Sequence, residues 1–314
     1  MSEKIPLLVL NSLSQEHQAQ VAAVYDMTYL PVPAQAERDA LIAAQGARFR
    51  AVLTIGSIGL TAAEMDAMPK LELVCCMGAG YEAVALDAAR ARGIALANGA
   101  GTNDDCVADH AFGLLIGAMR HIRTLDRLCR EGVRREIIPH PPNVSGKRIG
   151  ILGLGTIGRK IAKRAAGFDM EIGYHNRTPR DGVPHRYFDT ALGLATWADI
   201  LVVATPGGAG TRHLVDAAVL DALGPKGFLV NISRGSVVDT EALAAALRGG
   251  RIAGAGLDVY ESEPLPPEPL IGLDNVLLTP HMAGWSPEAT QASLDRFLAN
   301  AEGHFSGRGV VSAI

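Results

Sequence analysis

Three charged groups follow apolar runs closely enough to act from the ends of strands: Arg234, an acid within 258–263 (Asp258, Glu261 or Glu263), and His281. A guanidinium presents a planar fork of donors that suits a carboxylate, and an imidazole with an ordinary pKa of about 6.5 exchanges a proton near neutral pH. A carboxylate beside an imidazole favours its protonated form. Taken singly, the three residues have ordinary explanations as surface charge, solvated acid and structural histidine. Together, after successive strands, they predict a site that binds an acid and transfers a proton.

A glycine-rich turn provides the second chemical signal. Gly153, Gly155 and Gly158 form Gly-x-Gly-x-x-Gly between the apolar run 148–152 and a segment with helical period, 156–166. Another apolar run follows at the spacing of a βαβ unit. This context makes the motif diagnostic of a dinucleotide site, with chance spacing among 35 glycines as the alternative.

Each position of that turn has a physical task. Gly153 permits the tight turn, Gly155 lets the backbone approach a pyrophosphate, and Gly158 lets helix and strand pack closely. The amides near Thr156 and Ile157 would hold the anion together with the helix dipole.

The residues after the second strand indicate which dinucleotide is bound. An NAD fingerprint places Asp or Glu there, on the adenosine ribose, whereas this chain has Asn176, Arg177, Thr178 and then Arg180. A carboxylate would repel a 2′-phosphate, and a guanidinium can bind it bidentately. The sequence therefore predicts NADP(H) in preference to NAD(H), with solvated loop arginines as the alternative.

A sheet must position these residues, and the chain alternates short apolar runs with segments of helical period. That alternation predicts α/β architecture, in which helices cover both faces of parallel sheets. About four such units precede residue 99 and about six follow residue 146, so we expect two doubly wound, Rossmann-like sheets. The expected strands are 7–10, 51–55, 71–76, 94–97, 148–152, 171–175, 200–204, 228–232, 253–259 and 276–279, and expected helices include 36–45, 87–92, 156–166 and 240–247.

Two longer helices are predicted outside this alternation. Residues 104–131 carry apolar residues at helical spacing, so we expect one long amphipathic helix. It is either an ordinary connector or a link between domains that also offers a dimer face. Residues 286–305 are helical by pattern, with Ser286 and Pro287 as a helix-start pair.

Length and composition limit the class of protein. The 314 residues suggest two domains, and 48% hydrophobic with 20% charged residues is ordinary for a globular protein. The formal net charge of −4 argues against a nucleic-acid-binding protein and against a polybasic membrane-binding one. We expect neither a signal peptide nor a membrane span, and hence a soluble, cytoplasmic protein.

The cysteines give no sign of a metal or of a disulfide framework. Cys75, Cys76, Cys106 and Cys129 form no Cys-x-x-Cys pair and have no metal-ligand spacing with histidine. We therefore expect no metal, and reduced thiols in a cytosolic protein.

The motifs resemble those of the D-2-hydroxyacid dehydrogenase family over essentially the whole chain. Within that family, Asn176-Arg177-Thr178 and Thr205-Pro206-Gly207-Gly208 look like the NADPH-dependent glyoxylate/hydroxypyruvate reductase branch. The resemblance implies hydride transfer to a small 2-oxoacid, giving the D-2-hydroxyacid. The segments that carry it are 153–158, 230–239 (Asn-x-x-Arg-Gly-x-x-Val-Asp), 256–264 and 279–284, with 78–82 resembling the substrate loop and 98–109 the hinge.

The resemblance also implies a catalytic triad of Arg234, Glu263 and His281. Arg234 would bind the 2-oxoacid, His281 would protonate the developing alkoxide, and Glu263 would orient the imidazole and favour its charged form. Glu261 could be mistaken for Glu263, but the family pattern places the catalytic acid immediately before a proline. The backbone of Gly78, Ala79 and Gly80 would bind the substrate carboxylate, alongside Arg234 and His281.

The same resemblance implies a domain layout. Residues 1–98 and 287–314 would form a flavodoxin-like substrate-binding domain, and 99–286 an NAD(P)-binding Rossmann domain, with the active site in the cleft between them. The family is usually dimeric through the cofactor domain, so a homodimer is expected. Implied cofactor contacts are Gly153, Gly155, Thr156, Ile157, Gly158, Asn176, Arg177, Thr178, Thr205, Pro206, Thr211, Ile232, Ser233, Asp258, Ala283 and Gly284.

The same residues fit other substrates and another class of protein. The substrate could be a bulkier or aromatic 2-oxoacid, and Met77, Tyr81 and Trp285 could shape its pocket or simply pack. Formate oxidation is disfavoured because the formate enzymes resemble this pattern but have Gln where Glu263 stands. From a different class, some relatives are corepressors that use a dinucleotide as a conformational ligand.

Overall fold

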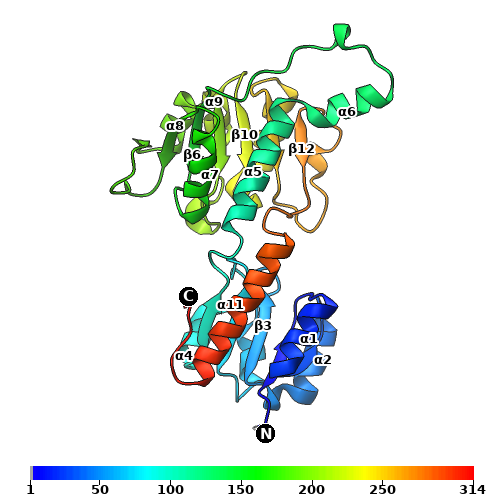
Figure 1. Cartoon of the computed structure of the whole chain (residues 1–314), viewed down its shortest axis with the longest axis vertical. Coiled ribbons are helices and arrows are strands. Elements are labelled where there is room, and N and C mark those ends of the chain that lie inside the picture. Colours follow the sequence, from blue (N-terminus) through cyan, green and yellow to red (C-terminus); the bar gives the residue numbers. More distant parts are fainter. Residues whose placement is uncertain (1–2) are drawn as a thin grey trace. The chain divides into compact units, whose positions relative to one another are not determined.

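The chain folds into two α/β units, each built around its own parallel sheet, in a computed structural model that describes residues 3–314 (Figure 1). One unit runs to Asn103 and resumes at Trp285–Ile314, and the other is Asp104–Gly284. The sequence suggested boundaries at 98/99 and 286/287. The first unit is thus assembled from both ends of the chain.

The first unit contains a five-stranded sheet in the order β2-β1-β3-β4-β5, with every pairing parallel. Register is continuous through the centre, where Leu7 pairs with Ala51 and Ala51 with Leu73. The strands are β1 (Pro6–Val9), β2 (Asp26–Tyr29), β3 (Ala51–Ile55), β4 (Leu73–Met77) and β5 (Ala95–Asn98).

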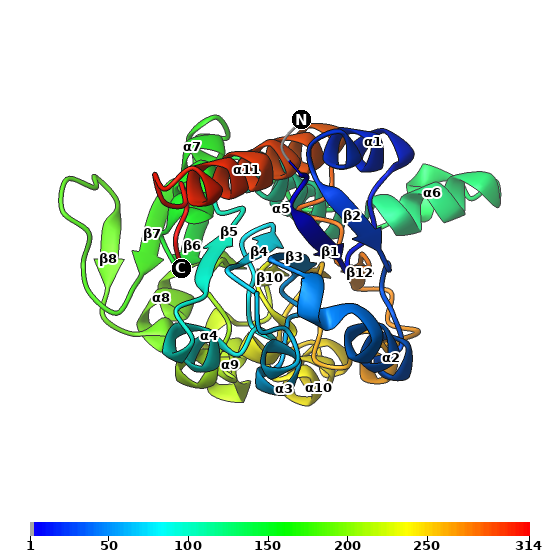
Figure 2. The ribbon, with the colours of Figure 1, turned by 90° about the horizontal axis from the view of Figure 1, so that it is seen from below.

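Helices cover both faces of this sheet because its strands are apolar on both sides. Figure 2 shows α1 (Gln15–Val24) and α11 (Pro287–Phe305) along one face, where they pack on alternate strand residues. The other residues of each strand face α2 (Gln35–Gln45), α3 (Ala62–Asp66) and α4 (Leu86–Ala91). A 3₁₀ turn, η1 (Gly46–Arg48), follows α2.

The neighbouring cysteines of β4 lie on opposite faces of the sheet. Cys75 packs in the cluster with α11, and Cys76 packs in the cluster with α2 and α3. All four cysteines are free. Burial raises the pKa of Cys75 strongly, and burial together with Glu82 raises the pKa of Cys76 to about 12. Neither thiol is therefore poised to form the reactive thiolate.

The second unit contains a seven-stranded parallel sheet in the order β12-β11-β10-β9-β6-β7-β8. The chain builds outward from β6 to β8, then returns to β9 on the other side of β6 and continues to β12. The order therefore reverses between β6 and β9, the place where open α/β sheets bind ligands outside the carboxyl ends of their strands. The strands are β6 (Arg148–Leu152), β7 (Glu171–His175), β8 (Arg186–Phe188), β9 (Ile200–Val203), β10 (Phe228–Asn231), β11 (Gly254–Leu257) and β12 (Val276–Leu278).

Helices again cover both faces of the seven-stranded sheet. One core cluster lies under α5 (Asp104–Met119) and α7 (Thr156–Ala166). The other lies under α8 (Ala191–Trp197), α9 (Ala217–Leu223) and α10 (Thr240–Arg248). The 3₁₀ turns of this unit are η2 (Arg135–Ile137), η3 (Ala209–Thr211), η4 (Gly235–Val237) and η5 (Glu268–Leu270). The predicted pair of doubly wound parallel sheets is confirmed.

The predicted continuous helix over 104–131 is wrong. The structure has two helices, α5 and α6 (Ile122–Arg130), separated where His121 adopts a left-handed φ of 52°. The helix α5 is buried against the sheet as far as Met119, whereas α6 has no buried residue. The apolar residues keep their helical spacing through the break, but the sheet surface that α5 packs against does not continue under α6, so the two segments do not form one straight helix.

Two short edge strands, β2 and β8, were not predicted. Each is three or four residues long and only partly buried, so neither produces an apolar run. The C-terminal helix begins as predicted, because the Ser286 side chain accepts a hydrogen bond from the Ala289 amide and Pro287 occupies the first turn. Within residues 3–314, no helix is long and apolar enough to cross a membrane.

Candidate active site

The three predicted catalytic side chains follow three adjacent strands of the seven-stranded sheet. Arg234 lies beyond β10, Glu263 beyond β11 and His281 beyond β12, and β10, β11 and β12 are neighbours in that order. Because the strands are parallel, their carboxyl ends share one edge. The sheet therefore gathers residues that are up to 47 positions apart in the sequence.

His281 and Glu263 form the central contact of this edge. The imidazole Nδ1 lies 2.7 Å from Glu263 Oε2, and Glu263 Oε1 accepts a hydrogen bond of 2.8 Å from the Tyr260 amide. An ionised carboxylate only accepts, so Nδ1 carries the proton in this contact and Nε2 is the nitrogen available for proton exchange. The His281 side chain is 51% exposed, which leaves it accessible.

The surroundings favour the charged imidazolium. The hydrogen bond to Glu263 raises the pKa of His281, while burial and the charge of Arg234 oppose that rise, and the net effect is a pKa above the ordinary value. The protonated form therefore persists to higher pH than it does for a free histidine. Such a group can act as a proton donor near neutral pH.

Asp258 holds the loop that presents His281. Its carboxylate accepts hydrogen bonds from the Thr279 hydroxyl (2.6 Å) and from the amides of Met282 (2.8 Å) and Ala283 (2.7 Å). Its carbonyl accepts a further bond of 2.9 Å from the His281 amide. These contacts fix His281 at a left-handed φ of 55°, which a residue other than glycine adopts only when held there.

The Asp258 carboxylate is only 1% exposed but remains ionised. Burial acts to raise its pKa, and hydrogen bonds from His110, Thr279 and the two amides outweigh that effect, so the pKa lies below the usual value. A buried charge satisfied by several donors is a rigid anchor.

The Asn-x-x-Arg-Gly pattern around Arg234 has a direct structural explanation. The buried Asn231 side chain accepts from the Ser233 amide and donates to the Arg234 carbonyl, so it closes the turn after β10. A Cβ atom on Gly235 would lie 2.0 Å from the Tyr260 carbonyl carbon, so only glycine lets this turn pack against the loop that leads to Glu263. The Arg234 guanidinium donates to the Ser233 carbonyl at 2.7 Å.

Glu261 and Glu263 are only two residues apart but have different partners. Glu261 Oε1 lies 2.7 Å from His213 Nε2, and its Oε2 accepts from the Thr240 amide at the start of α10. Burial acts to raise the pKa of Glu261, and these bonds bring the net pKa below the usual value. Glu261 therefore ties together neighbouring loops of the unit, whereas Glu263 contacts His281.

The glycine-rich turn has the geometry of a dinucleotide site. Gly153 has a φ of +98°, and a Cβ atom on Gly158 would lie 2.1 Å from the Gly153 carbonyl oxygen. A Cβ on Gly155, in contrast, would meet nothing within 4 Å, which leaves room for a phosphate beside the backbone. The helix α7 starts at Thr156 without a side-chain cap, so its first backbone amides are left to donate to a phosphate beside Gly155.

Asn176 supports that turn from the end of β7. Its Oδ1 accepts a hydrogen bond of 2.7 Å from the Leu154 amide, inside the fingerprint. Sequence reasoning assigned Asn176 to the cofactor and did not anticipate this structural bond. Arg177, Thr178 and Arg180 follow and are exposed, and across residues 3–314 neither guanidinium forms an ion pair. Two free cations and no carboxylate at this point fit a 2′-phosphate.

The remaining predicted cofactor residues follow other strands of the same sheet edge. Thr205 and Pro206 come after β9, and the Thr211 hydroxyl donates to the Pro206 carbonyl at 2.7 Å, closing that loop. The other members of this set are Ile232 and Ser233 after β10, and Ala283 and Gly284 after His281.

The predicted substrate loop belongs to the other unit, at the carboxyl end of β4. The Gly78 carbonyl accepts from the Gly99 amide at 2.7 Å, and the Ala79 carbonyl accepts from the Asn98 side chain at 2.8 Å. These two carbonyls are therefore engaged by the last residue of β5 and the residue that follows it.

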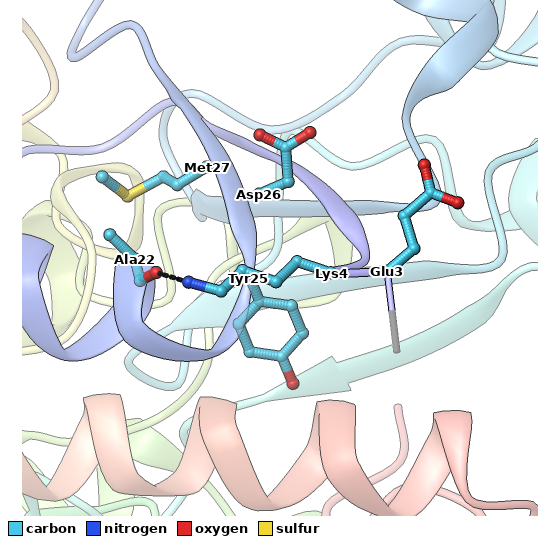
Figure 3. A pocket seen from close by; sticks show the side chains of 6 residues that line it. All are labelled: Glu3, Lys4, Ala22, Tyr25, Asp26 and Met27. Carbon is cyan, nitrogen blue, oxygen red and sulfur yellow. Dashed lines mark hydrogen bonds between the residues drawn. The ribbon is translucent and has the colours of Figure 1, made fainter. Parts of the chain in front are cut away.

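A surface hollow of about 470 Å³ lies elsewhere in that unit, at the amino ends of β1 and β2 (Figure 3). Among the residues drawn there, Lys4 Nζ donates a hydrogen bond of 2.6 Å to the Ala22 carbonyl. Ligands of open α/β sheets bind at the carboxyl edge, so this hollow is not a candidate site. The residues that line the hollow are Glu3, Lys4, Ala22, Tyr25, Asp26 and Met27. Separately, no cluster of three metal-ligating side chains occurs within residues 3–314.

Known proteins resemble this chain in sequence and in fold. Residues 112–283 match the family described as D-isomer specific 2-hydroxyacid dehydrogenase, NAD binding domain. The chain is 40% identical over 280 residues to hydroxyphenylpyruvate reductase of Plectranthus scutellarioides, covering 89% of each chain. It is 40% identical over 279 residues to a glyoxylate/hydroxypyruvate reductase of Arabidopsis thaliana, covering 88% of this chain and 89% of that one.

A solved structure is similar over nearly the full length. The NADPH-dependent glyoxylate/hydroxypyruvate reductase of Sinorhizobium meliloti, in complex with NADP and malonate, superposes with a TM-score of 0.90 at 36% identity. The match covers 99% of this chain and 97% of that one.

Replacing Glu263 with Gln should lower the pKa of the His281 imidazole toward its ordinary value, because the substitution removes the charge that stabilises the imidazolium. NMR titration of the His281 ring measures this directly. Glu261→Gln is the matched control, because Glu261 contacts His213 instead. Equal shifts in the two variants, or none in Glu263→Gln, would contradict the assigned contact.

Proposed function

The chain belongs to the D-isomer specific 2-hydroxyacid dehydrogenase family, and from this premise we propose that it reduces glyoxylate or hydroxypyruvate with NADPH. The product is the corresponding 2-hydroxyacid, of D configuration where it is chiral. The observation that carries the proposal is the 2.7 Å contact between His281 and Glu263, on the same sheet edge as the dinucleotide turn. A proton donor beside a hydride donor is what ketone reduction requires.

The triad divides the chemistry among its members. Arg234 binds the 2-oxoacid through its guanidinium fork, and His281 delivers the proton from Nε2 to the carbonyl oxygen as that oxygen becomes an alkoxide. Glu263 keeps the imidazole protonated and oriented through Nδ1. When bound, NADPH supplies the hydride to the carbonyl carbon, so one hydride and one proton convert the ketone into the alcohol.

The backbone of Gly78, Ala79 and Gly80 is assigned to the substrate carboxylate. The carbonyls of Gly78 and Ala79 accept from Gly99 and Asn98, which orders the loop, and the backbone amides are left to donate to the substrate. Residues 1–98 with 287–314 are accordingly assigned to substrate binding, and 99–286 to NAD(P) binding.

The preference for NADP(H) over NAD(H) rests on the residues after β7. Arg177 and Arg180 are exposed cations without ion-pair partners in the described chain, and no acid occupies position 176. The Sinorhizobium meliloti relative is described as NADPH-dependent and was solved with NADP. The residues assigned to hold the cofactor are Gly153, Gly155, Thr156, Ile157, Gly158, Asn176, Arg177, Thr178, Thr205, Pro206, Thr211, Ile232, Ser233, Asp258, Ala283 and Gly284.

An aromatic 2-oxoacid is the second candidate substrate. It is favoured by the 40% identity to a hydroxyphenylpyruvate reductase, which equals the identity to the glyoxylate/hydroxypyruvate reductase. Because these relatives are named reductases, catalysis is favoured over a corepressor role.

A direct assay tests the proposed function. Purified protein should consume NADPH rapidly with glyoxylate or hydroxypyruvate, and more slowly with pyruvate, phenylpyruvate or hydroxyphenylpyruvate, as followed by nicotinamide absorbance. His281→Ala should reduce kcat by at least about 100-fold, the scale of a lost proton donor. NADPH binding, measured by fluorescence, should stay near that of the wild type.

Two results would change the assignment. Faster turnover of the aromatic acids would show that the substrate is an aromatic 2-oxoacid and not glyoxylate or hydroxypyruvate. Near-normal activity of His281→Ala would show that His281 is not the proton donor.

Arg177→Asp tests the choice of cofactor. Loss of a charge-assisted bond to the 2′-phosphate should reduce kcat/KM for NADPH by about 10- to 100-fold, while kcat/KM for NADH changes by less than about threefold, since NADH has no such phosphate. Lys163→Asp, an equal charge change at the exposed far end of α7, is the control and should not separate the two cofactors. Equal losses for NADPH and NADH in Arg177→Asp would refute this role.

The protein is further proposed to be a cytoplasmic homodimer that binds neither nucleic acid nor membranes. The net charge of −4 supports the last two points. The dimer proposal is supported by α6, which has no buried residue and extends away from the sheet of its own unit (Figure 1). Ile122 at its start is 52% exposed and Ile137 in the following turn is 77% exposed.

Light scattering after size exclusion should therefore give about twice the protomer mass of 33.0 kDa. Ile122→Glu together with Ile137→Glu should shift the mass toward that of the monomer. Exposed Leu192, changed to Glu, provides a control on a different helix. A monomeric wild type would contradict the dimer.

A further inference from the structure

His110 is a polar residue on α5 that the triad does not use, and it contacts the anchor of the His281 loop. Its Nε2 lies 2.9 Å from the Thr279 hydroxyl and 3.4 Å from Asp258 Oδ1. The sequence alone does not distinguish it, because a lone histidine on an amphipathic helix has no local signal of function. Its side chain is about one-quarter exposed.

The direction of the hydrogen bonds follows from the number of protons available. The Thr279 hydroxyl has one proton, and it is donated to the Asp258 carboxylate at 2.6 Å, since an ionised carboxylate only accepts. The Thr279 oxygen must therefore accept from His110, so Nε2 of His110 carries a proton. The result is a directed chain from His110 through Thr279 to Asp258.

Close packing of α5 against β11 brings His110 to this position. A Cβ on Gly256 would lie 2.9 Å from Leu114 Cβ, so glycine allows the helix to approach the strand. His110 precedes Leu114 by four residues, about 6 Å of helix, and Asp258 follows Gly256 by two, about 6.6 Å of strand. The helix and strand thus place His110 level with the end of β11.

We propose that His110 is a positioning residue, which through the Thr279 hydroxyl fixes the Asp258 carboxylate in the orientation that holds the 279–283 loop and presents His281. This inference rests on the proposed role of His281. Both the neutral Nε2–H tautomer and the imidazolium provide the required donor.

Four variants test whether the N–H donor of His110, and not its ring, holds the loop. His110→Phe keeps a ring without the donor, and His110→Gln keeps an N–H at similar reach without the ring. Thr279→Val interrupts the same chain at the hydroxyl. Asp109→Asn is the control, since it lies next to His110 on α5 but pairs with Arg164.

Hydrogen–deuterium exchange of the cofactor-free protein is the first readout. In His110→Phe and Thr279→Val, the segment 279–284 should exchange about tenfold faster, because the Met282 and Ala283 amides are held by Asp258. The β10 segment should be unchanged. His110→Gln and Asp109→Asn should match the wild type.

Kinetics is the second readout. In both disrupting variants kcat should fall roughly 10- to 100-fold, the scale of a misplaced catalytic group, with a smaller change in KM. The fall of kcat at high pH should move to lower pH, because Glu263 and Asp258, which raise the pKa of His281, outweigh Arg234, which lowers it, and their alignment is lost. The His110→Phe/Thr279→Val double variant should be no worse than either single one.

The outcomes separate the possible failures. Wild-type exchange and kcat in His110→Phe, or faster exchange throughout the chain, would overturn the positioning role; if His110→Phe does not fold, Thr279→Val decides. A defect in His110→Gln equal to that of His110→Phe, with a normal Thr279→Val, would also overturn it. A wild type inactive toward every 2-oxoacid would refute the proposed function instead, while the exchange result still decides whether His110 holds the loop.

Discussion

The buried carboxylate of Asp258 is the constraint on which the catalytic edge depends. Leaving such a charge unpaired in the interior would cost several kcal/mol, so the chain must bring donors to it. It does so with the Thr279 hydroxyl and the amides of Met282 and Ala283. Satisfying this charge therefore folds the loop after β12 back over the end of β11.

The geometry of His281 is a consequence of that fold. Its left-handed backbone conformation is unfavourable by roughly 1–2 kcal/mol for a residue with a side chain, and the surrounding hydrogen bonds outweigh this cost. The Asp258 carbonyl also accepts from the His281 amide, and the Asp258 carboxylate accepts from the two amides that follow His281. The strained residue is therefore held by both the main chain and the side chain of Asp258. The imidazole is thus aimed at Glu263 by backbone constraints, before any substrate contact.

Much of this architecture could be predicted because it depends on local patterns. Apolar runs fixed most central strands, and the glycine spacing with its flanking strand and helix identified the dinucleotide turn. The break at His121 was missed because periodicity records spacing and not whether a partner surface continues. The edge strands β2 and β8 were missed because partial burial leaves no apolar run.

The contacts that require tertiary knowledge could not be predicted. Asn176 has the chemistry of a cofactor ligand, but its Oδ1 supports the Leu154 amide, a partner 22 residues away. His110 meets Thr279 across 169 residues, and only the approach of α5 to Gly256 brings them together. A resemblance identified which acid precedes the proline, but the separate partners of Glu261 and Glu263 are visible only in the fold.

Asp258, which positions the His281 loop, is buried, whereas His281, the group proposed to react, is exposed. Asp258 is 1% exposed and its carboxylate is enclosed by donors, so its charge is fixed and its proton affinity is low. His281 has a half-exposed side chain, as a group that exchanges protons must, and Glu263 beside it is 28% exposed. Burial on its own lowers the pKa of the imidazole, and the Glu263 contact outweighs it, so the pKa of His281 lies above the ordinary value. A rigid buried anion therefore supplies the geometry, while a second, accessible anion supplies the protonation state, and neither carboxylate could perform both tasks in one environment.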